Sequence, residues 1–192
     1  MIAGQVDTLI SEGANWDYLD NGTDQGTAWK ETDFVIDANW RNGPAELGYG
    51  DNDEATVVSF GPSSTNKYIT TYFRHTFNVA NPSQYDSGTL RLLRDDGAAV
   101  YLNGSEVVRV NLPVGAGHLT LAAPYQIGPP TEQTFFSYNI DPTLLVAGTN
   151  VVAVEVHQGA LNSSDISMNL ELTAEVASSG SGFPVNPGVD RI

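Results

Sequence analysis

The sequence ISMNLELTAEV, residues 166–176, alternates apolar and polar side chains without interruption. Successive side chains of a β-strand point to opposite faces of a sheet, so a period of two predicts a strand with one buried face. The opposite face would carry the Ser, Asn, Glu and Thr side chains between the apolar positions. The predicted buried set is Ile166, Met168, Leu170, Leu172, Ala174 and Val176.

Working outward from this stretch, shorter segments of the same kind fill the middle of the chain. They lie at 70–79, 89–94, 98–102, 106–110, 134–140 and 151–157. Asn103-Gly104 separates two of them and predicts a tight hairpin, because both residues tolerate the positive φ of a type I′ turn. The best helical candidates are short turns at 32–40 and 141–145. About eight strands without alternating helices predict an all-β fold, an antiparallel β-sandwich.

The composition narrows the possible functions. The chain has 192 residues, no cysteine and a net charge of −15. It can therefore form neither disulfides nor thiolate metal sites, and without a basic cluster it is not expected to bind nucleic acid. No apolar run approaches the ~20 residues of a membrane span, and the first residues lack the pattern of a signal peptide. We expect one β-sandwich module over 1–176 and a flexible linker or tail over 177–192, which is rich in Ser, Gly and Pro.

The order of several short motifs resembles the galactose-binding-like jelly roll, found as the sugar-binding domain of family 2 glycoside hydrolases and in carbohydrate-binding modules of secreted bacterial proteins. The resemblance implies a jelly-roll sandwich that binds sugar through loops or a concave face and commonly holds a structural Ca²⁺. It also implies that catalytic residues would lie in a separate barrel, which this chain lacks. The matching motifs are WDYLD at 16–20, Trp29 with DFVIDANW at 33–40, GYG at 48–50, YFR at 72–74, RDDGAAVYLNG at 94–104 and LVAGTNVVAVEVH at 145–157.

Aromatic residues are the first candidates for a sugar site, because pyranose C–H faces stack on their rings. The candidates are Trp16, Trp29, Trp40, Tyr49, Tyr125 and Tyr138. We expect Trp16 and Trp29 to pack inside the sandwich. Loops bind ligands more often than strands do, so we predict a ligand site at Trp40, Arg41, Asn42 and Tyr49.

Acidic turns are the candidates for a structural Ca²⁺, which prefers carboxylate and carbonyl oxygens. The alternative is that each carboxylate caps its own turn, and we prefer this for the Asp-Asp-Gly step at 95–97. That step is also similar to the Asp-Asp pair of protective-antigen-type domains, in which the pair holds Ca²⁺. Residues 51–62 are not an EF-hand, because Thr and Pro stand where Gly and Glu are required. The candidate metal ligands are Asp51, Asp53, Asp95, Asp96 and Asp165.

The histidines and the nucleophile motifs give little support for catalysis. His75 shares the apolar side of its strand and is expected in the core, while His118 lies in a Gly-rich loop. Glu155 and His157 share one face of a strand and could bind a cation or a sugar hydroxyl. No nucleophile elbow, zinc-protease motif or phosphate-binding loop is present, so we predict a non-catalytic protein.

The sequence therefore leads to two hypotheses. The first is an accessory module that binds a polysaccharide or another glycan for a larger secreted or cell-surface bacterial protein, with other domains as partners. The alternative is a structural or adhesive spacer stabilised by Ca²⁺ that binds no sugar. Both predict an extracellular location, no nucleic-acid partner and no membrane insertion.

Overall fold

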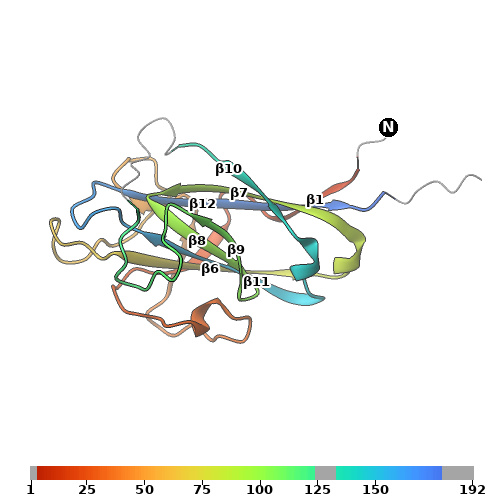
Figure 1. The fold of residues 1–192 in the computed structure, drawn as a ribbon, viewed down its shortest axis with the longest axis horizontal. Helices are drawn as coiled ribbons and strands as arrows, with labels where there is room; N and C mark the ends of the chain where they lie inside the picture. The colour runs from red at the N-terminus through yellow and green to blue at the C-terminus, as the bar shows by residue number, and fades with distance from the viewer. Residues whose placement is uncertain (1–3, 124–132, 179–192) are drawn as a thin grey trace, which may run out of the picture.

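Two β-sheets packed face to face form the protein. The computed structural model describes residues 4–123 and 133–178, and within these ranges each sheet has six strands. Figure 1 shows the two layers, with β7, β12 and β10 in one and β6, β11, β8 and β9 in the other. The predicted all-β sandwich is confirmed. Among the described residues, no helix is long and apolar enough to cross a membrane.

The first sheet has the strand order β10-β7-β12-β4-β5, and β1 also pairs with β12. Its neighbours are antiparallel except for the short parallel pair β4–β5. Strand β12 is the predicted alternating stretch, and it lies at the centre of the sheet. The strands are β1 (Val6–Ile10), β4 (Leu47–Tyr49), β5 (Thr56–Val57), β7 (Tyr85–Asp95), β10 (Phe136–Ile140) and β12 (Ile166–Val176).

The second sheet has the order β3-β2-β6-β11-β8-β9, with every neighbouring pair antiparallel. Its long central strands pair over ten residues, from Gly148 opposite Val79 to His157 opposite Thr70. The strands are β2 (Asn15–Leu19), β3 (Arg41–Pro44), β6 (Thr70–Val79), β8 (Gly97–Leu102), β9 (Ser105–Val110) and β11 (Gly148–His157).

The predicted hairpin joins β8 to β9. Asn103 and Gly104 have φ values of 50° and 80°, as a type I′ turn requires. The Asn103 carboxamide also ties the turn to the rest of the sheet, accepting from the Val151 amide at 2.9 Å and donating to the Leu144 carbonyl at 2.9 Å. A side chain at Gly104 would require the carboxylate of Glu31, the far end of an exposed side chain, to move aside. The turn is therefore fixed by both its backbone and its neighbours.

Apolar side chains from both sheets fill the space between them. Phe73, Leu92, Val154 and Leu170 have no exposed surface. The predicted inward face of β12 is buried from Ile166 to Ala174, while Val176 at the strand end is half-buried.

The outward face of β12 departs from the expected exposed face. Ser167 and Asn169 are buried there as well. Flanking loops cover them: the Gly13 amide donates to the Asn169 carboxamide oxygen at 3.3 Å, and the Ser167 hydroxyl donates to Asp51 at 3.5 Å. The alternating pattern therefore predicts the inward face of β12 correctly. It does not predict that loops cover the outward face.

Trp16 and Trp29 are both buried, as predicted, but in different places. Trp16 lies in the core between the sheets, beside His75, with ring centroids 5.3 Å apart. His75 is half-buried at the margin of that core, with its Nδ1 2.7 Å from the Asn15 carbonyl. Trp29 belongs to a second apolar cluster on the other side of the second sheet.

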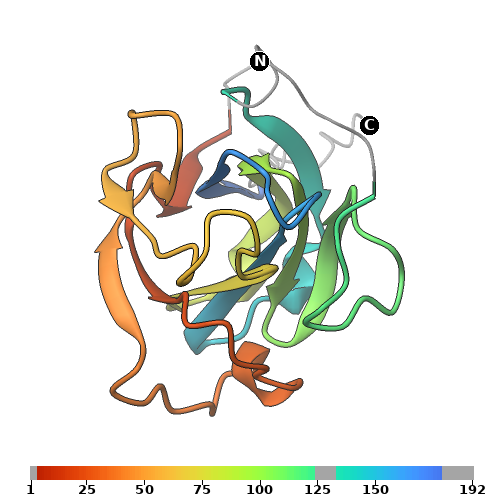
Figure 2. The same ribbon diagram turned by 90° about the vertical axis from the view of Figure 1, so that its left-hand side faces the viewer.

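This second cluster covers the outer face of the second sheet, and we call it the outer-face cluster. Two loop segments, residues 20–40 and 111–123, lie over it; the first contains the short 3₁₀ helix η1 (Ala28–Lys30). In Figures 1 and 2 the segment that carries η1 lies outside the sandwich, below the second sheet. The buried members of the cluster are Leu19, Trp29, Trp40, Tyr72, Ala99, Tyr101, Leu112, Val151 and Ala153.

The two predicted helical turns have different outcomes. Within the first, 32–40, the chain makes turns but no helix: the Phe34 amide donates to the Glu31 carbonyl at 3.4 Å and the Trp40 amide to the Asp37 carbonyl at 3.2 Å. The 3₁₀ helix η1 lies just before them. The second is confirmed as η3 (Pro142–Leu144), in which Asp141 accepts from the Thr143 amide at 2.9 Å. A third short turn, η2 (Pro82–Gln84), leads into β7. Most of the predicted tail, residues 179–192, lies outside the described residues.

Candidate ligand-binding pocket

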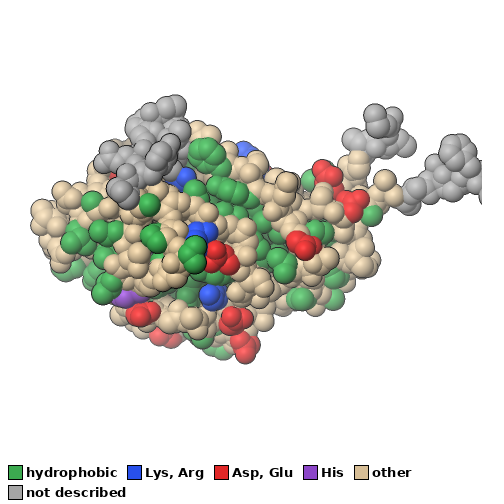
Figure 3. All heavy atoms as spheres, viewed as in Figure 1, with side chains coloured by type: hydrophobic (Ala, Val, Ile, Leu, Met, Phe, Trp, Pro, Cys, Tyr) green, Lys and Arg blue, Asp and Glu red, His purple; other side chains and the backbone are tan. Residues whose placement is uncertain are grey.

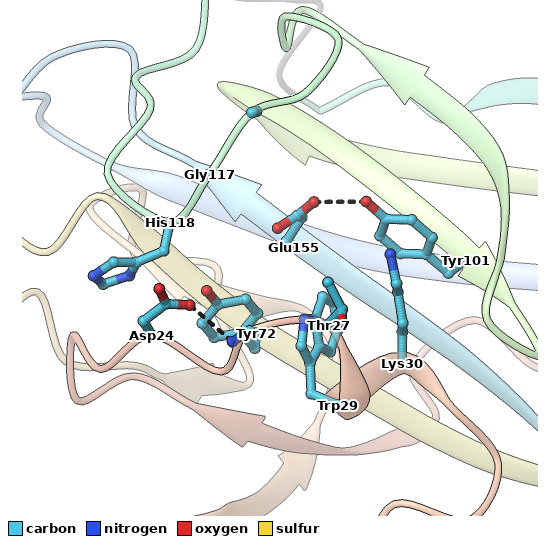
Figure 4. A pocket seen from close by; sticks show the side chains of 11 residues that line it. Asp24, Thr27, Trp29, Lys30, Tyr72, Tyr101, Gly117, His118 and Glu155 are labelled. Carbon is cyan, nitrogen blue, oxygen red and sulfur yellow. Dashed lines mark hydrogen bonds between the residues drawn. The ribbon is translucent and has the colours of Figure 1, made fainter.

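A hollow of about 230 Å³ opens on the outer face of the second sheet. Its floor comes from β6, β11 and β8, and its walls come from the two covering segments (Figure 4). Three aromatic rings and several charged or polar groups therefore meet in one small space. The lining residues are Asp24, Gly26, Thr27, Trp29, Lys30, Tyr72, Tyr101, Ala116, Gly117, His118 and Glu155.

The aromatic part is built around Trp29. Its ring lies 4.8 Å from Tyr72 at an angle of 60° and 5.9 Å from Tyr101 at 87°, measured between centroids. Such tilted and edge-to-face contacts are favourable for aromatic rings. Each ring is at most 5% exposed. The three rings therefore form part of the wall of a hollow and not a flat, exposed platform.

Glu155 is the buried acid of the pocket, at 7% exposure. The Tyr101 hydroxyl donates to its Oε1 at 2.8 Å, the bond drawn in Figure 4. Burial, followed by the negative charge of Glu155, raises the pKa of Tyr101 and of Tyr72 well above the usual tyrosine value. Both hydroxyls consequently keep their protons at neutral pH and can serve as donors.

A basic group supports the Tyr101 hydroxyl from the side of β9. The Arg109 guanidinium donates to it at 3.3 Å and forms an ion pair with Glu106 at 2.5 Å. This pair raises the pKa of Arg109 and lowers that of Glu106. The Glu106 carboxylate thus holds Arg109 in place, and Arg109 in turn orients the Tyr101 hydroxyl.

His157 and Thr70 anchor the loop that forms the upper wall. His157 Nδ1 lies 2.7 Å from the Thr120 carbonyl, and the Thr70 hydroxyl donates to the His118 carbonyl at 2.7 Å. His157 Nε2 lies 3.3 Å from Glu155 Oε2. The same strand end therefore holds both the loop and the buried acid.

Within the pocket, His118 offers an unsatisfied polar atom. Its Nδ1 is buried and has no hydrogen-bond partner within the described residues. In Figure 4 its ring lies beside Asp24, at the end of the pocket away from Tyr101. A bound hydroxyl or water could satisfy this nitrogen.

The lower wall is positioned by a buried arginine. Arg74 of β6 donates to the Trp29 carbonyl and, at 3.1 Å, to the Glu31 carbonyl, so it holds the middle residue of η1 and the residue that follows η1. Burial lowers the pKa of this guanidinium. The adjacent Asp24 carboxylate accepts from the Gly26 amide at 2.8 Å, which closes the turn at the rim.

Charge around the pocket is mixed. The Lys30 ammonium lies 4.1 Å from the centroid of the Tyr101 ring, a cation–π contact. Figure 3 shows basic and acidic side chains next to each other in the middle of this side of the molecule. Against one lysine, the pocket has the two carboxylates of Asp24 and Glu155.

The predicted ligand residues are distributed over two regions. Trp40 is 8% exposed and packs edge-on against Phe34 at 6.1 Å in the outer-face cluster. Its neighbours in sequence lie at the edge strand β3, where Arg41 pairs with Asp20 and the Asn42 carboxamide donates to Asp17 at 2.8 Å. Trp40 does not line the pocket.

Tyr49 lies in the other cluster, between the sheets, and is 6% exposed. Its hydroxyl accepts from the Gln158 side chain, and its ring lies 5.3 Å from Phe60. The Lys67 ammonium stands 4.6 Å from its ring centroid and donates to the carbonyls of Ser163 and Ser164. The structure thus does not bring Tyr49 together with Trp40. A ligand-binding role for either residue, or for Arg41 and Asn42, remains a prediction.

The predicted metal ligands, by contrast, converge from three loops on one end of the sandwich. Asp165 and Asp53 add negative potential at Asp51, and Asp165, Asp96 and Asp95 do so at Tyr49. Among residues 4–123 and 133–178, however, no three His, Asp or Glu side chains are grouped so as to hold a metal ion. A structural Ca²⁺ remains a prediction.

The structure gives Asp96 a structural role, as preferred for the Asp-Asp-Gly step, but the groups that it binds lie in another loop and not in its own turn. Its carboxylate accepts from the Gly159 amide at 2.5 Å and from the Ser163 hydroxyl at 3.4 Å. It therefore links the turn after β7 to the loop after β11.

From the sequence, Glu155 was a possible ligand of a cation or a sugar hydroxyl, but it was not included in the predicted site. His118 was noted only as a loop residue, and Trp29 was expected only to pack inside the sandwich. Tyr72, Tyr101, Lys30 and Asp24 were missed. The signal for the two tyrosines was their position on the polar-facing side of otherwise apolar strands. Tyr125 lies outside the described residues, and Tyr138 is half-buried on β10.

Comparison with known proteins supports the fold. No protein-family model matches the chain, and no curated protein matches it in sequence. Solved structures of bacterial β-glucuronidases share its fold. One from an uncultured Clostridium species has a TM-score of 0.55 at 14% identity, over 92% of this chain and 30% of that one. One from Ruminococcus gnavus has a TM-score of 0.53 at 14% identity, over 91% and 29%.

A third similar structure is a calcium-binding mutant of Bacteroides uniformis β-glucuronidase 2, with a TM-score of 0.54 at 19% identity, over 88% of this chain and 18% of that one. The chain thus spans less than a third of the length of each of these enzymes. At such identities the likeness shows a common sandwich fold and does not extend to residues of a site.

Proposed function

We propose that the protein is a non-catalytic module that binds the terminal residue of a glycan in the pocket of Glu155, Trp29, Tyr72 and Tyr101. The observation that supports this most is the pocket itself, where aromatic rings and hydroxyl-binding groups converge from separate segments. A volume of about 230 Å³ is smaller than the ~300–1,000 Å³ of sites for larger ligands and suits one sugar ring.

The chemistry of the lining fits a pyranose. Its C–H face can lie against the aromatic rings while its hydroxyls donate to the carboxylates of Asp24 and Glu155. The unsatisfied Nδ1 of His118 adds a further polar contact at the far end. Because the pocket groups are already fixed by Arg74, Arg109 and His157, little ordering is needed when a ligand binds.

The absence of catalysis is part of this proposal. The matching segment covers 30% of one similar β-glucuronidase and 18% of another, so this fold accounts for only part of each enzyme. An accessory role in a larger extracellular or cell-surface protein, with other domains as partners, follows the same reasoning. Incubation with polysaccharides should release no new reducing ends.

A pocket-filling variant provides the direct test. Gly117 lines the pocket, and a Cβ placed on it meets no atom within 4 Å. Gly117→Tyr should therefore place a ring in the pocket without disturbing the core. Glycan-array screening followed by NMR titration should show binding to the native protein and at least a tenfold loss in this variant.

Gly4→Tyr serves as the matched control, because its Cβ meets only the Val176 carbonyl, at an ordinary 3.6 Å, away from the pocket. It should bind like the native protein. Equal binding by Gly117→Tyr would place the site elsewhere. Failure of the native protein to bind any glycan would leave the spacer function as the better explanation.

A further inference from the structure

We infer that the pocket selects a sugar with a protonated amino group, such as a hexosamine with a free amine, over an acidic sugar. This inference rests on the proposed function and specifies its ligand class. It depends on the partners of Glu155, on the cation that already touches the pocket aromatics, and on the charge of the lining.

Glu155 is a buried carboxylate with few donors. Its one short hydrogen bond is from the Tyr101 hydroxyl at 2.8 Å. No Lys or Arg nitrogen in the described part of the chain lies within ion-pair distance of it. Arg109 reaches this carboxylate only through the Tyr101 hydroxyl, so an ammonium ion in the pocket would add the direct contact that no Lys or Arg side chain of the described residues makes.

His157 does not replace that cation when it is neutral. Its Nδ1 lies 2.7 Å from the Thr120 carbonyl, which requires the proton to be on Nδ1. The neutral ring then presents an unprotonated Nε2 to Glu155 Oε2 at 3.3 Å. The neutral ring therefore offers that side of the carboxylate no donor, whereas the doubly protonated ring would offer one.

The chain itself shows that an ammonium ion suits this environment. The Lys30 Nζ sits 4.1 Å from the centroid of Tyr101, at the edge of the pocket. Asp24 places a second carboxylate at the other end, beside His118 (Figure 4). A ligand amine lying between Asp24 and Glu155 would meet aromatic faces and negative charge, whereas a uronate carboxylate would meet repulsion from both acids.

The net charge of the chain also favours a cationic ligand over an anionic one. At −15 it produces a negative potential that attracts cations and repels anions before contact. The pocket and the surrounding surface therefore favour the same sign of ligand.

NMR titrations at about pH 7, where a sugar amine is mostly protonated, test the inference. The probes are the methyl glycosides of glucosamine, N-acetylglucosamine and glucuronic acid, together with an Nα-acetylated lysine amide. We expect the glucosaminide to bind at least tenfold more tightly than the other three, a difference typical of one charge-assisted hydrogen bond.

Glu155→Gln and Asp24→Asn should each reduce this preference about tenfold, since each removes one negative charge and keeps the shape of the side chain. Glu175→Gln makes the same change on an exposed position of the first sheet and should leave the preference intact. Asp24 is exposed, so its variant remains informative if Glu155→Gln does not fold.

The other outcomes separate the two proposals. Equal or tighter binding of the N-acetylated or acidic sugar would overturn the amine preference and leave glycan binding standing. Equal binding of the lysine amide would overturn the requirement for a sugar. Unchanged spectra with all probes and with the glycans of the array would overturn the proposed function itself.

Discussion

Two regions of the molecule contain the same kinds of side chain but arrange them differently. Each has aromatic rings, carboxylates and a lysine. At the end of the sandwich around Tyr49, the Lys67 ammonium lies over the rings of Tyr49 and Phe60 and donates to two loop carbonyls. In the pocket, the Lys30 ammonium lies over the Tyr101 ring alone, 4.1 Å from its centroid, and a hollow of about 230 Å³ remains beside it.

The difference shows how an aromatic-acidic cluster becomes either a structural element or a binding site. Lys67 is only 8% exposed, and it fills the space that a bound cation would need. Around Glu155 the chain supplies the walls but leaves that space open. The test of this comparison is whether the first region contributes mainly to stability and the second mainly to binding.

Replacing Lys67 should have the largest effect on stability. Lys67→Met removes a buried ammonium that bonds two carbonyls and stacks on two rings, so the loss of unfolding free energy should be about 3 kcal/mol. Lys30→Met should cost less than about 1 kcal/mol, because only its contact with Tyr101 is lost. Urea denaturation of both variants measures the difference. Equal losses would mean that the two lysines have the same role.

Replacing Arg74 should have the next largest effect on stability. This side chain also holds η1, which forms a wall of the pocket. Arg74→Met should cost about 2 kcal/mol and should speed amide hydrogen exchange at residues 28–31, where the carbonyls lose their donor. Arg91→Met is the control: that side chain is 39% exposed and pairs with Glu171 at the surface, worth less than about 1 kcal/mol. Unchanged exchange in Arg74→Met would show that η1 is held by packing alone.

The bond between Tyr101 and Glu155 should give a smaller, measurable coupling. A double-mutant cycle of Tyr101→Phe and Glu155→Gln should show a coupling free energy of about 1 kcal/mol, as expected for a hydrogen bond to a carboxylate that is partly offset by hydration of the open pocket. Urea unfolding of the four proteins provides the values. Additive effects would mean that Glu155 is already satisfied by other groups.

The fold could be predicted from the sequence because its signals are local. The alternation in β12 and the Asn103-Gly104 turn depend on side-chain period and backbone φ, which neighbouring residues determine. The outer-face cluster could not be predicted in this way. Tyr72 and Tyr101 lie on the side of their strands that alternation assigns to solvent, and they are buried by segments 20–40 and 111–123, which no local pattern places over them.

The same reasoning explains the outcome for the candidate sites. Loop position directed attention to Trp40 and Tyr49, but burial of a ring depends on which segments fold over it, and no local pattern encodes that. Glu155 was recognisable as an acid next to His157 on an apolar strand. Glu155 is more than a hundred residues away from Trp29 and Asp24 in the sequence. Only the three-dimensional structure therefore shows that the three residues line one pocket.

The acidic side chains in the loops near Tyr49 should have the smallest effect on stability. Lys67 does not neutralise all of these acids. Burial, followed for Asp51 by the negative charge of Asp165 and Asp53, raises the pKa of Glu46 and Asp51. An acid whose pKa is raised by folding makes the folded state less stable at neutral pH, and this penalty disappears as the pH falls from the raised value to that of the unfolded chain.

Asp51→Asn and Glu46→Gln should therefore each raise the unfolding free energy at neutral pH, by only a few tenths of a kcal/mol because these groups are partly solvated. The gain should shrink as the pH falls and vanish below pH ~3, where the wild-type acids are protonated in both states. Denaturation in calcium-free buffer across this pH range measures it. The structural Ca²⁺ predicted from sequence would reverse the sign for Asp51→Asn when the ion is added, because the ligand would then be lost with the charge. An unchanged melting temperature of the native protein with added Ca²⁺ would instead leave Lys67 as the cation that organises this end of the sandwich.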